Sequence, residues 1–247
     1  MNSRIKPEPT SASLHLIAMA LMLCDHLWGT IVPGNDWLTC LGRISFPIFA
    51  FLIVEGYFHT SNLKKYVNRL LLFALLSEIP FNLAMGSRII YPFHQNVLWT
   101  FLIAMYMIAM TERAKERGGG LWAAAVGIAA VILGMLLGTV AMVDYFGAGV
   151  AMVMLFYFAR GRRWYHFALQ AAGMYYLNVE MLKGLYYPVT LFGHEFEFYQ
   201  QSLALLALIP IWLYRGRQGH HSKAFRFACY AFYPVHMLIL AAVRAMM

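Results

Sequence analysis

The sequence predicts an all-α fold, a polytopic transmembrane helical bundle of about nine spans that forms one domain over residues 1–247. Three observations predict it. Of the 247 residues, 61% are hydrophobic and only 12% are charged, and that charged share is about half the value typical of soluble domains. The apolar residues fall into long blocks instead of helical stripes. No Pro-, Gly- or Ser-rich linker divides the chain.

Each expected span is an apolar block near the length of about 20 residues that crosses a hydrocarbon core. Residues 1–11 form a short polar tail, and no small-residue cleavage site follows the first block, so we expect no removed signal peptide. The segment "GLYYPVTLFGHEFEFYQ" is apolar enough to be re-entrant or to lie in the membrane interface. In order, the blocks occupy residues 12–32, 37–58, 66–86, 95–111, 121–140, 144–159, 164–182, 199–214 and 228–245.

The basic residues are strongly asymmetric across these blocks. When successive connections between the blocks are assigned alternately to the two sides of the membrane, one side receives only Arg88, Lys183 and Arg244. The other side receives fifteen Lys and Arg residues. The positive-inside rule predicts a cytoplasmic N-terminus and an outer C-terminus in a bacterial cytoplasmic membrane. Topology therefore explains the net charge of +8, and nucleic acid is not an expected partner. The fifteen residues are Arg4, Lys6, Lys64, Lys65, Arg69, Arg113, Lys115, Arg117, Arg160, Arg162, Arg163, Arg215, Arg217, Lys223 and Arg226.

The first block carries Asp25 and His26 inside the apolar run "LIAMALMLCDHLWGTIV". Ionisable groups are costly in hydrocarbon, so intramembrane residues of this kind are functional candidates. Adjacent helical residues point about 100° apart. The two side chains therefore cannot act side by side as a base and its orienting group, and we expect them to have different partners. The rise of a helix predicts that they share their depth, in the outer half of the membrane, with Arg43, Glu78, Asn82, Gln95 and Asn96.

Arg43 requires an anion at that depth, and the preferred partner is Asp25, with Glu78 as the alternative. Proline at positions 47, 80 and 234 is expected to interrupt the second, third and ninth spans. His236 lies near the midplane of the ninth span, where a packing role and a catalytic role are about equally open. Purely structural helix pairing remains an alternative for the whole polar cluster. No metal spacing, Gly-rich phosphate loop or Gly-x-Ser-x-Gly turn is present, so neither a metal nor a prosthetic group is expected.

Four stretches resemble one family: "LHLIAMALMLCDH", "LGRISFPIFAFLIVEGYFHTSNLKKYVNRLLLFALLSEIPFNLA", "HQNVLWT" and "YAFYPVHMLIL". They look like the TraX family of membrane proteins, which is associated with N-acetylation of conjugative pilin, over residues 14–100 and 229–240. The resemblance implies an enzyme related to the wider superfamily of transmembrane acyltransferases. Those proteins take an acetyl group from cytoplasmic acetyl-CoA and deliver it to an acceptor at the outer face. His26 stands in the place of the first-span histidine that is thought to be their base.

We therefore expect a general base that activates an amine or hydroxyl acceptor for attack on the acetyl-CoA thioester. Arg43 or nearby amide side chains would hold the developing oxyanion or the acceptor. The acceptor itself is open: a peptide amine such as a pilin-like N-terminus, a sugar, a lipid or a small molecule. The candidate catalytic residues are His26, Asp25, Arg43 and Glu78, and the candidate substrate-binding residues are Asn82, Gln95, Asn96 and His236.

Two other functions remain open. A proton-coupled transporter would use the same intramembrane groups as a relay, although no internal repeat of the transporter kind is present. A non-catalytic membrane assembly factor would use them only for packing. The phosphates of CoA would need cations on the cytoplasmic side. No loop is favoured among those that supply Lys64, Lys65, Arg69, Arg160, Arg162 and Arg163.

Overall fold

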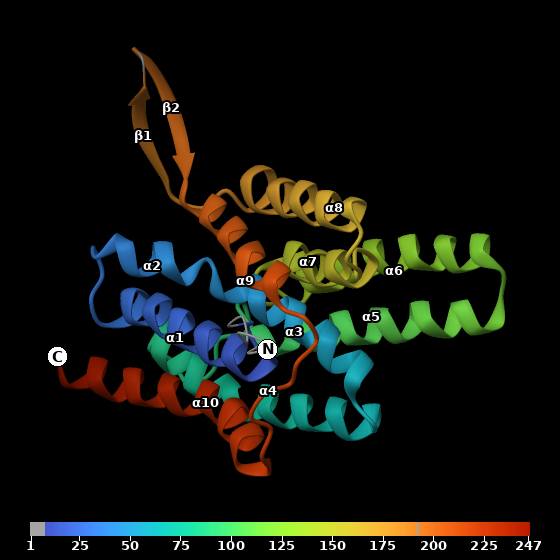
Figure 1. The fold of residues 1–247 in the computed structure, drawn as a ribbon. Helices are drawn as coiled ribbons and strands as arrows, with labels where there is room; N and C mark the ends of the chain where they lie inside the picture. The colour runs from blue at the N-terminus through green and yellow to red at the C-terminus, as the bar shows by residue number, and fades with distance from the viewer. Residues whose placement is uncertain (1–7, 192) are drawn as a thin grey trace, which may run out of the picture.

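The computed structural model describes residues 8–191 and 193–247, which form a bundle of helices with one β-hairpin at its side (Figure 1). The α-helices are α1 (Ser11–Thr30), α2 (Asp36–Gly42), α3 (Ser45–His59), α4 (Leu63–Gly86), α5 (Val97–Arg117), α6 (Gly120–Val140), α7 (Phe146–Phe158), α8 (Trp164–Tyr175), α9 (Leu208–Leu213) and α10 (Lys223–Met246). A π-helix, η1 (Tyr176–Leu182), continues α8, and a 3₁₀-helix, η2 (Gln200–Ala207), leads into α9. The strands are β1 (Tyr186–Leu191) and β2 (His194–Tyr199).

Within the described residues, six helical stretches are long and apolar enough to cross a membrane: α1, α2 together with α3, α4, α5, α6 and α10. The other three expected spans are helical but shorter or irregular, since they correspond to α7, to α8 with η1, and to η2 with α9. The chain is thus a multi-pass helical membrane protein. The count of nine spans and the orientation of the termini stay predictions.

Helix α4 shows how the bundle meets lipid. Its exposed leucine and isoleucine side chains recur every three to four residues, which places them on one face of the helix. The opposite face of α4 is buried and packs chiefly on α10 and α5. A continuous uncovered apolar face suits a hydrocarbon solvent instead of water. The exposed residues on this face are Leu71, Leu72, Leu75, Leu76 and Ile79.

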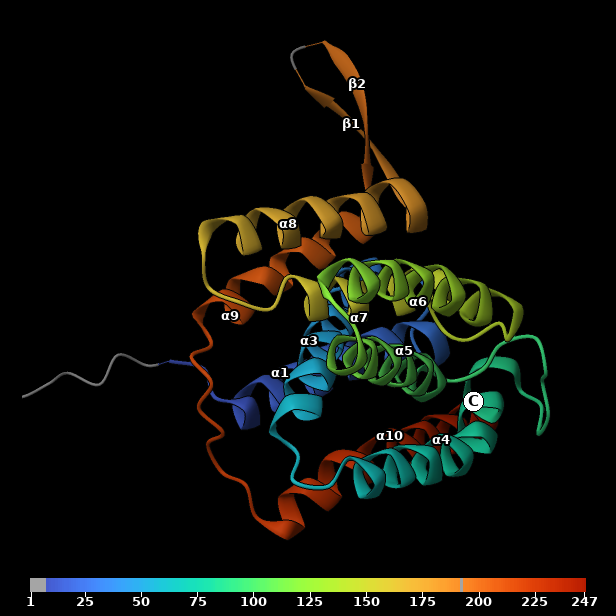
Figure 2. The ribbon, with the colours of Figure 1, turned by 90° about the vertical axis from the view of Figure 1, so that its right-hand side faces the viewer.

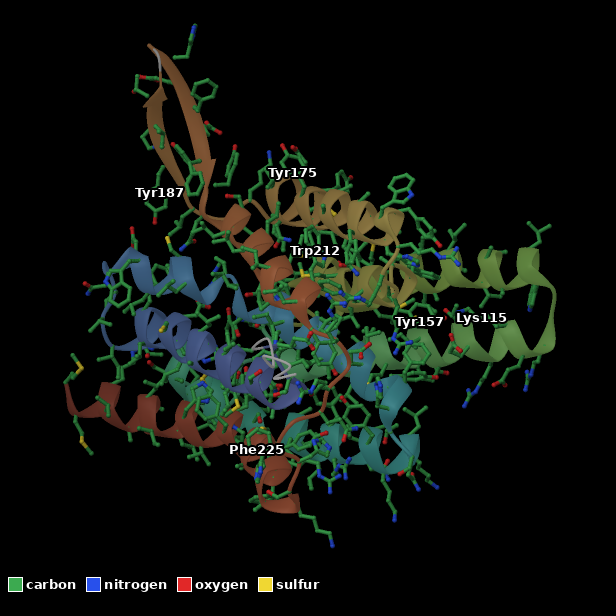
Figure 3. The ribbon with its side chains drawn as sticks, viewed as in Figure 1. Lys115, Tyr157, Tyr175, Tyr187, Trp212 and Phe225 are labelled. Carbon is green, nitrogen blue, oxygen red and sulfur yellow. The ribbon has the colours of Figure 1, made fainter. Side chains whose placement is uncertain are left out.

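The loops gather at two opposite ends of the bundle. At one end, the Ser11 N–H donates to the carbonyl of Arg217 at 2.8 Å, and Arg160 binds Glu55 at 2.9 Å. We call this the basic end, formed by residues 60–62, 118–119, 159–163 and 214–222. Lys115 and Tyr157 lie near it, with the ammonium 4.7 Å from the ring centre (Figure 3). The opposite end is formed by residues 31–35, 87–96, 141–145 and 183–185.

The β-hairpin is a correction to the predicted all-α class. Strands β1 and β2 pair antiparallel, with Tyr186 opposite Tyr199, and the hairpin projects from the bundle beyond α8 (Figures 1 and 2). The segment expected to be re-entrant or interfacial is rich in Tyr, Phe, Val and Thr, which favour strands. Gly193 has a φ of +80° in the turn, a conformation that favours glycine. At its base, Tyr187 donates to Asp36 Oδ2 at 3.1 Å (Figure 3).

The second span is broken at Arg43 and Ile44, between α2 and α3. Pro47 is the third residue of α3, where a helix has no partner for the backbone N–H and proline is tolerated. The expected interruptions at Pro80 and Pro234 are wrong, because α4 and α10 run through both positions. The break in the second span therefore falls at the arginine that the sequence singled out.

Candidate functional site

Asp25 and Arg43 form an ion pair between α1 and the break after α2. Each side chain is 19% exposed, and Thr39 Oγ1 donates to the same carboxylate oxygen at 2.6 Å. Gly42 permits this approach, since a Cβ built there would lie 2.3 Å from Asp25 Cβ. The structure therefore contains the Asp25–Arg43 pair, which was the preferred one of the two pairs expected for Arg43.

The network of Arg43 continues into a part of the chain for which the sequence suggested no role. Arg43 Nη1 donates to Gln201 Oε1 at 3.4 Å, and Gln201 Nε2 donates to Asn178 Oδ1 at 2.9 Å. Both amides are buried, on η2 and η1 respectively. Sequence reasoning missed them, as it missed Thr39, because a lone uncharged polar residue in an apolar block is commonly a simple interhelical hydrogen-bonding group.

His26 faces a different neighbour from Asp25, the α10 residue His236. Nδ1 of His26 lies 2.7 Å from Nε2 of His236, and the two rings are nearly parallel, at 7° with centroids 5.0 Å apart. Both side chains are buried, with 9% of His26 and 5% of His236 exposed. Nδ1 of His236 lies 2.6 Å from the carbonyl oxygen of Phe232. We call these two residues the histidine pair.

Hydrogen bonding assigns the protons of the neutral histidine pair. A carbonyl oxygen only accepts, so Nδ1 of His236 carries the proton and its Nε2 is an acceptor. Nδ1 of His26 must then be the donor to His236, which leaves the lone pair of His26 on Nε2. His236, and not the adjacent Asp25, is thus the residue that orients His26.

Glu78 belongs to a separate cluster at the start of α5. Its Oε2 accepts from Asn96 Nδ2 at 2.5 Å and from Trp99 Nε1 at 3.0 Å. Asn96 also donates to the carbonyl of Ala74 at 2.9 Å and caps the N–H of Leu98. The alternative pairing of Arg43 with Glu78 is therefore wrong. The other carboxylate oxygen, Oε1, is buried without a hydrogen-bond partner among the described residues.

Asn82 and Gln95 serve the loop between α4 and α5. Asn82 Nδ2 donates to the carbonyl of Ile89 at 3.4 Å, and Gln95 Nε2 donates to that of Pro92 at 2.8 Å. Asn82 Oδ1 is buried without a partner in the part of the chain that is described. The polar groups expected to share one depth thus do not form one hydrogen-bonded cluster, because equal depth does not fix the face on which a side chain lies. Three groups result: the ion pair, the histidine pair and the Glu78 cluster.

A cavity of about 300 Å³ opens among the loops of the basic end and runs inward between α1, α3, α4, α5 and α10. On α1 it follows one face of the helix, at His15, Met19 and Met22, and the next position on that face is His26. Its innermost residue on α10 is Tyr233, one turn before His236. The histidine pair therefore lies directly beyond the inner end of the cavity.

Tyr233 separates the cavity from the histidine pair. Its ring meets both imidazoles edge to face, with centroids 6.0 Å from His26 and 5.6 Å from His236. The ring is 5% exposed. Tyr233 lies in the stretch "YAFYPVHMLIL" that carries the family resemblance, but it was not among the candidate catalytic or substrate-binding residues.

The mouth of the cavity carries cations. Arg69 and Arg226 line it, near Phe225 at the start of α10 (Figure 3). Burial, and then the nearby Arg226, lower the pKa of His221, so this imidazole is neutral at pH 7. Arg162 is already engaged, because its guanidinium donates to the carbonyls of Tyr214 and Trp212. Within the described residues, no group of three or more His, Cys, Asp or Glu side chains could hold a metal ion.

The fold and this site define a class: a multi-pass helical membrane protein with a buried histidine pair beyond a cavity that opens at its basic end. The chain belongs to the TraX family, because the model of that family, described as TraX protein, matches residues 10–244. The resemblance seen over residues 14–100 and 229–240 is thereby confirmed and extends across the middle of the chain. Over 246 residues the chain is 25% identical to the probable fimbrial assembly protein FimC, serogroup H1, of Dichelobacter nodosus, with 94% of each chain covered. No solved structure matches it.

Proposed function

We propose that this protein is an acyltransferase of a bacterial cytoplasmic membrane, which moves an acetyl group from cytoplasmic acetyl-CoA to an acceptor amine or hydroxyl. The observation that carries the proposal is the cavity that opens at the basic end and ends at Tyr233, whose ring contacts both imidazoles of the histidine pair. Under the positive-inside rule the basic end faces the cytoplasm, where acetyl-CoA is found. The fimbrial relative supports a pilin-like N-terminus as one acceptor.

The cavity suits the donor. A volume of about 300 Å³ is at the lower end of the range that holds small ligands, so it would take the acetylated arm of CoA and leave the nucleotide at the mouth. Apolar walls, including Met19, Met22 and Phe101, would exclude water from the thioester. Arg69 and Arg226 would bind the phosphates. Arg160 and Arg162 are less suited because they already bind Glu55 and backbone carbonyls.

The histidine pair supplies the base. The acceptor nitrogen or oxygen attacks the thioester carbonyl carbon while Nε2 of His26 takes its proton. The C–S bond then breaks, and the departing thiolate receives that proton from His26. His236 stabilises the transient imidazolium, because its Nε2 accepts from Nδ1 of His26 throughout. Positioned proton transfer of this kind is typically worth about 10²–10⁴-fold in rate.

The Glu78 cluster supports an amine as the acceptor. Glu78 and Asn82 lie four residues apart on α4, so they share a face of the helix, and each has a buried oxygen without a partner among the described residues. Two such acceptors call for a group with several donors. An ammonium supplies them together with the positive charge that balances a buried carboxylate. Transfer of one ammonium proton to Glu78 would leave the neutral amine that attacks the thioester and gives its next proton to His26. A hydroxyl supplies one donor and no charge.

The experiment is acetyl transfer by the purified full chain in liposomes, with labelled acetyl-CoA as donor and n-octylamine as a probe amine. We expect CoA release and acetylated amine from the wild type. His26→Ala should lose this activity while it still binds acetyl-CoA, and His236→Ala should lose at least a large part of it. His194→Ala, on the exposed β-hairpin, is the matched control and should keep full activity.

The competing function is a non-catalytic assembly factor, which the name of the fimbrial relative favours. In that case the wild type should neither bind acetyl-CoA nor release CoA, and the histidine pair would only hold α1 and α10 together. A transporter would also release no CoA. Activity in the wild type that survives the loss of both histidines would contradict the proposed base.

A further inference from the structure

The hydroxyl of Tyr233 is a buried polar group that the mechanism above does not use. No described residue accepts a hydrogen bond from it, and the side chain is only 5% exposed. Its oxygen lies beside the backbone N–H of Val97. A buried hydroxyl whose proton has no acceptor destabilises a fold, because that proton loses its bond to water and gains none in return. A partner that enters the site from outside the chain would remove this penalty.

The surroundings of Tyr233 indicate what that partner is. Tyr233 lines the inner end of the cavity, together with Val97 and Leu98 from the first turn of α5. The N-terminus of a helix carries a partial positive charge. Both the hydroxyl and this helix end therefore favour an oxygen atom on which negative charge develops. The ring contacts of Tyr233 place it next to His26 and His236.

We propose that the Tyr233 hydroxyl donates a hydrogen bond to the thioester carbonyl oxygen of acetyl-CoA and stabilises the oxyanion of the tetrahedral intermediate. This inference rests on the proposed acyl transfer. It moves the oxyanion role to Tyr233 from the residues that the sequence suggested. Those residues, Arg43, Asn82, Gln95 and Asn96, hydrogen-bond to other side chains or to backbone carbonyls.

The chemistry balances without any further reactant. When the acceptor attacks, the carbonyl double bond opens and its electron pair moves to the oxygen that Tyr233 holds. When that pair returns, the C–S bond breaks and CoA leaves as a thiolate, which takes the acceptor proton from His26. Tyr233 keeps its own proton throughout, so it acts as an electrostatic catalyst and not as a base.

The test is the carbonyl stretch of acetyl-CoA, labelled with ¹³C at the carbonyl and bound to the full chain in detergent, measured by difference infrared spectroscopy. Binding to the wild type should lower the carbonyl frequency relative to that of free acetyl-CoA, and Tyr233→Phe should abolish most of that decrease. Tyr106→Phe is the control, since Tyr106 is 64% exposed on α5 and does not line the cavity. With n-octylamine as the acceptor, Tyr233→Phe should lower kcat by about 10²-fold at a nearly unchanged KM for acetyl-CoA.

The outcomes separate this inference from the proposed function. If wild type binds labelled acetyl-CoA but Tyr233→Phe shows the same carbonyl frequency, the role of Tyr233 is refuted and the acyl transfer proposal stands. If wild type does not bind acetyl-CoA, both are refuted. Because no described residue accepts the proton of this hydroxyl, Tyr233→Phe should change the melting temperature only slightly. Should the variant fail to fold, 3,5-difluorotyrosine at position 233, a stronger donor, must lower the carbonyl frequency further, and an unchanged frequency refutes the role.

Discussion

Replacement of Gly42 by alanine tests the closest contact in the candidate site. A Cβ at this position would lie 2.3 Å from Asp25 Cβ and 2.7 Å from its Cγ, whereas carbon atoms pack at about 3.5–4.0 Å. The atom that it meets is the Cβ of Asp25, which no rotamer change can move away. Helix α1 must therefore separate locally from α2 by more than about 1 Å, and the Asp25–Arg43 pair must lengthen or break.

The expected magnitude follows from overpacking, which costs about 1–3 kcal/mol of unfolding free energy. At about 2–4 °C per kcal/mol for a chain of this size, Gly42→Ala should lower the melting temperature in detergent by roughly 2–12 °C. Gly29→Ala is the control on α1, because its Cβ would lie 3.6 Å from the flexible Met85 Sδ. That variant should melt at or slightly above the wild-type temperature. If Gly42→Ala melts like Gly29→Ala, α1 and α2 are not as close as described.

Three further predictions concern charge. In a double-mutant cycle, Arg43→Ala and Asp25→Asn together should lower the melting temperature by less than the sum of the two single changes, since each change alone leaves a charge without its partner. Arg43→Ala and Glu78→Gln should be additive. The reverse pattern would make Glu78, and not Asp25, the partner of Arg43. The hydrogen bond that His94 Nε2 donates to Asp144 raises the pKa of His94, so stabilisation by this pair is complete below the unfolded His pKa of about 6.5 and is lost as pH rises through the raised value. The melting-temperature difference between wild type and Asp144→Asn should therefore shrink from about pH 6 to about pH 9, and a constant difference would contradict the coupling. Finally, a reporter that is active only outside the cytoplasm should be active when fused after residue 35, 90 or 190 and inactive after 62, 116 or 219.

The Asp25–Arg43 pair could be predicted from the sequence because hydrocarbon makes pairing nearly obligatory. An arginine in a span needs an anion, and few acidic residues lie inside the apolar blocks at the same depth. The different directions of Asp25 and His26 followed from the 100° step of a helix. Both arguments use properties of single helices, which do not depend on how the helices are arranged.

The remaining parts of the site depend on that arrangement and could not be predicted. Depth gave Glu78, Asn82 and Gln95 the same level as Asp25, but it could not show that they face the loop or the start of α5. The contact between His26 and His236 joins residues 210 positions apart in the chain. The resemblance included Tyr233, but its role could not be predicted, because that role depends on a buried hydroxyl proton without an acceptor. The β-hairpin was missed because an apolar aromatic segment in a membrane protein was read as interfacial.

The adjacency of Asp25 and His26, which first marked this helix, has a physical consequence for the proposed base. An unpaired carboxylate one residue from His26 would attract a proton to the imidazole and so remove the lone pair that a base requires. Arg43 and Thr39 bind this carboxylate on the α2 side of α1, which leaves the histidine pair with a nearly neutral neighbour. The ion pair and the histidine pair are thus separate in their contacts but linked in their charge. Gly42, by allowing α2 to approach Asp25, helps to keep a histidine that it does not touch in the unprotonated form that a base requires.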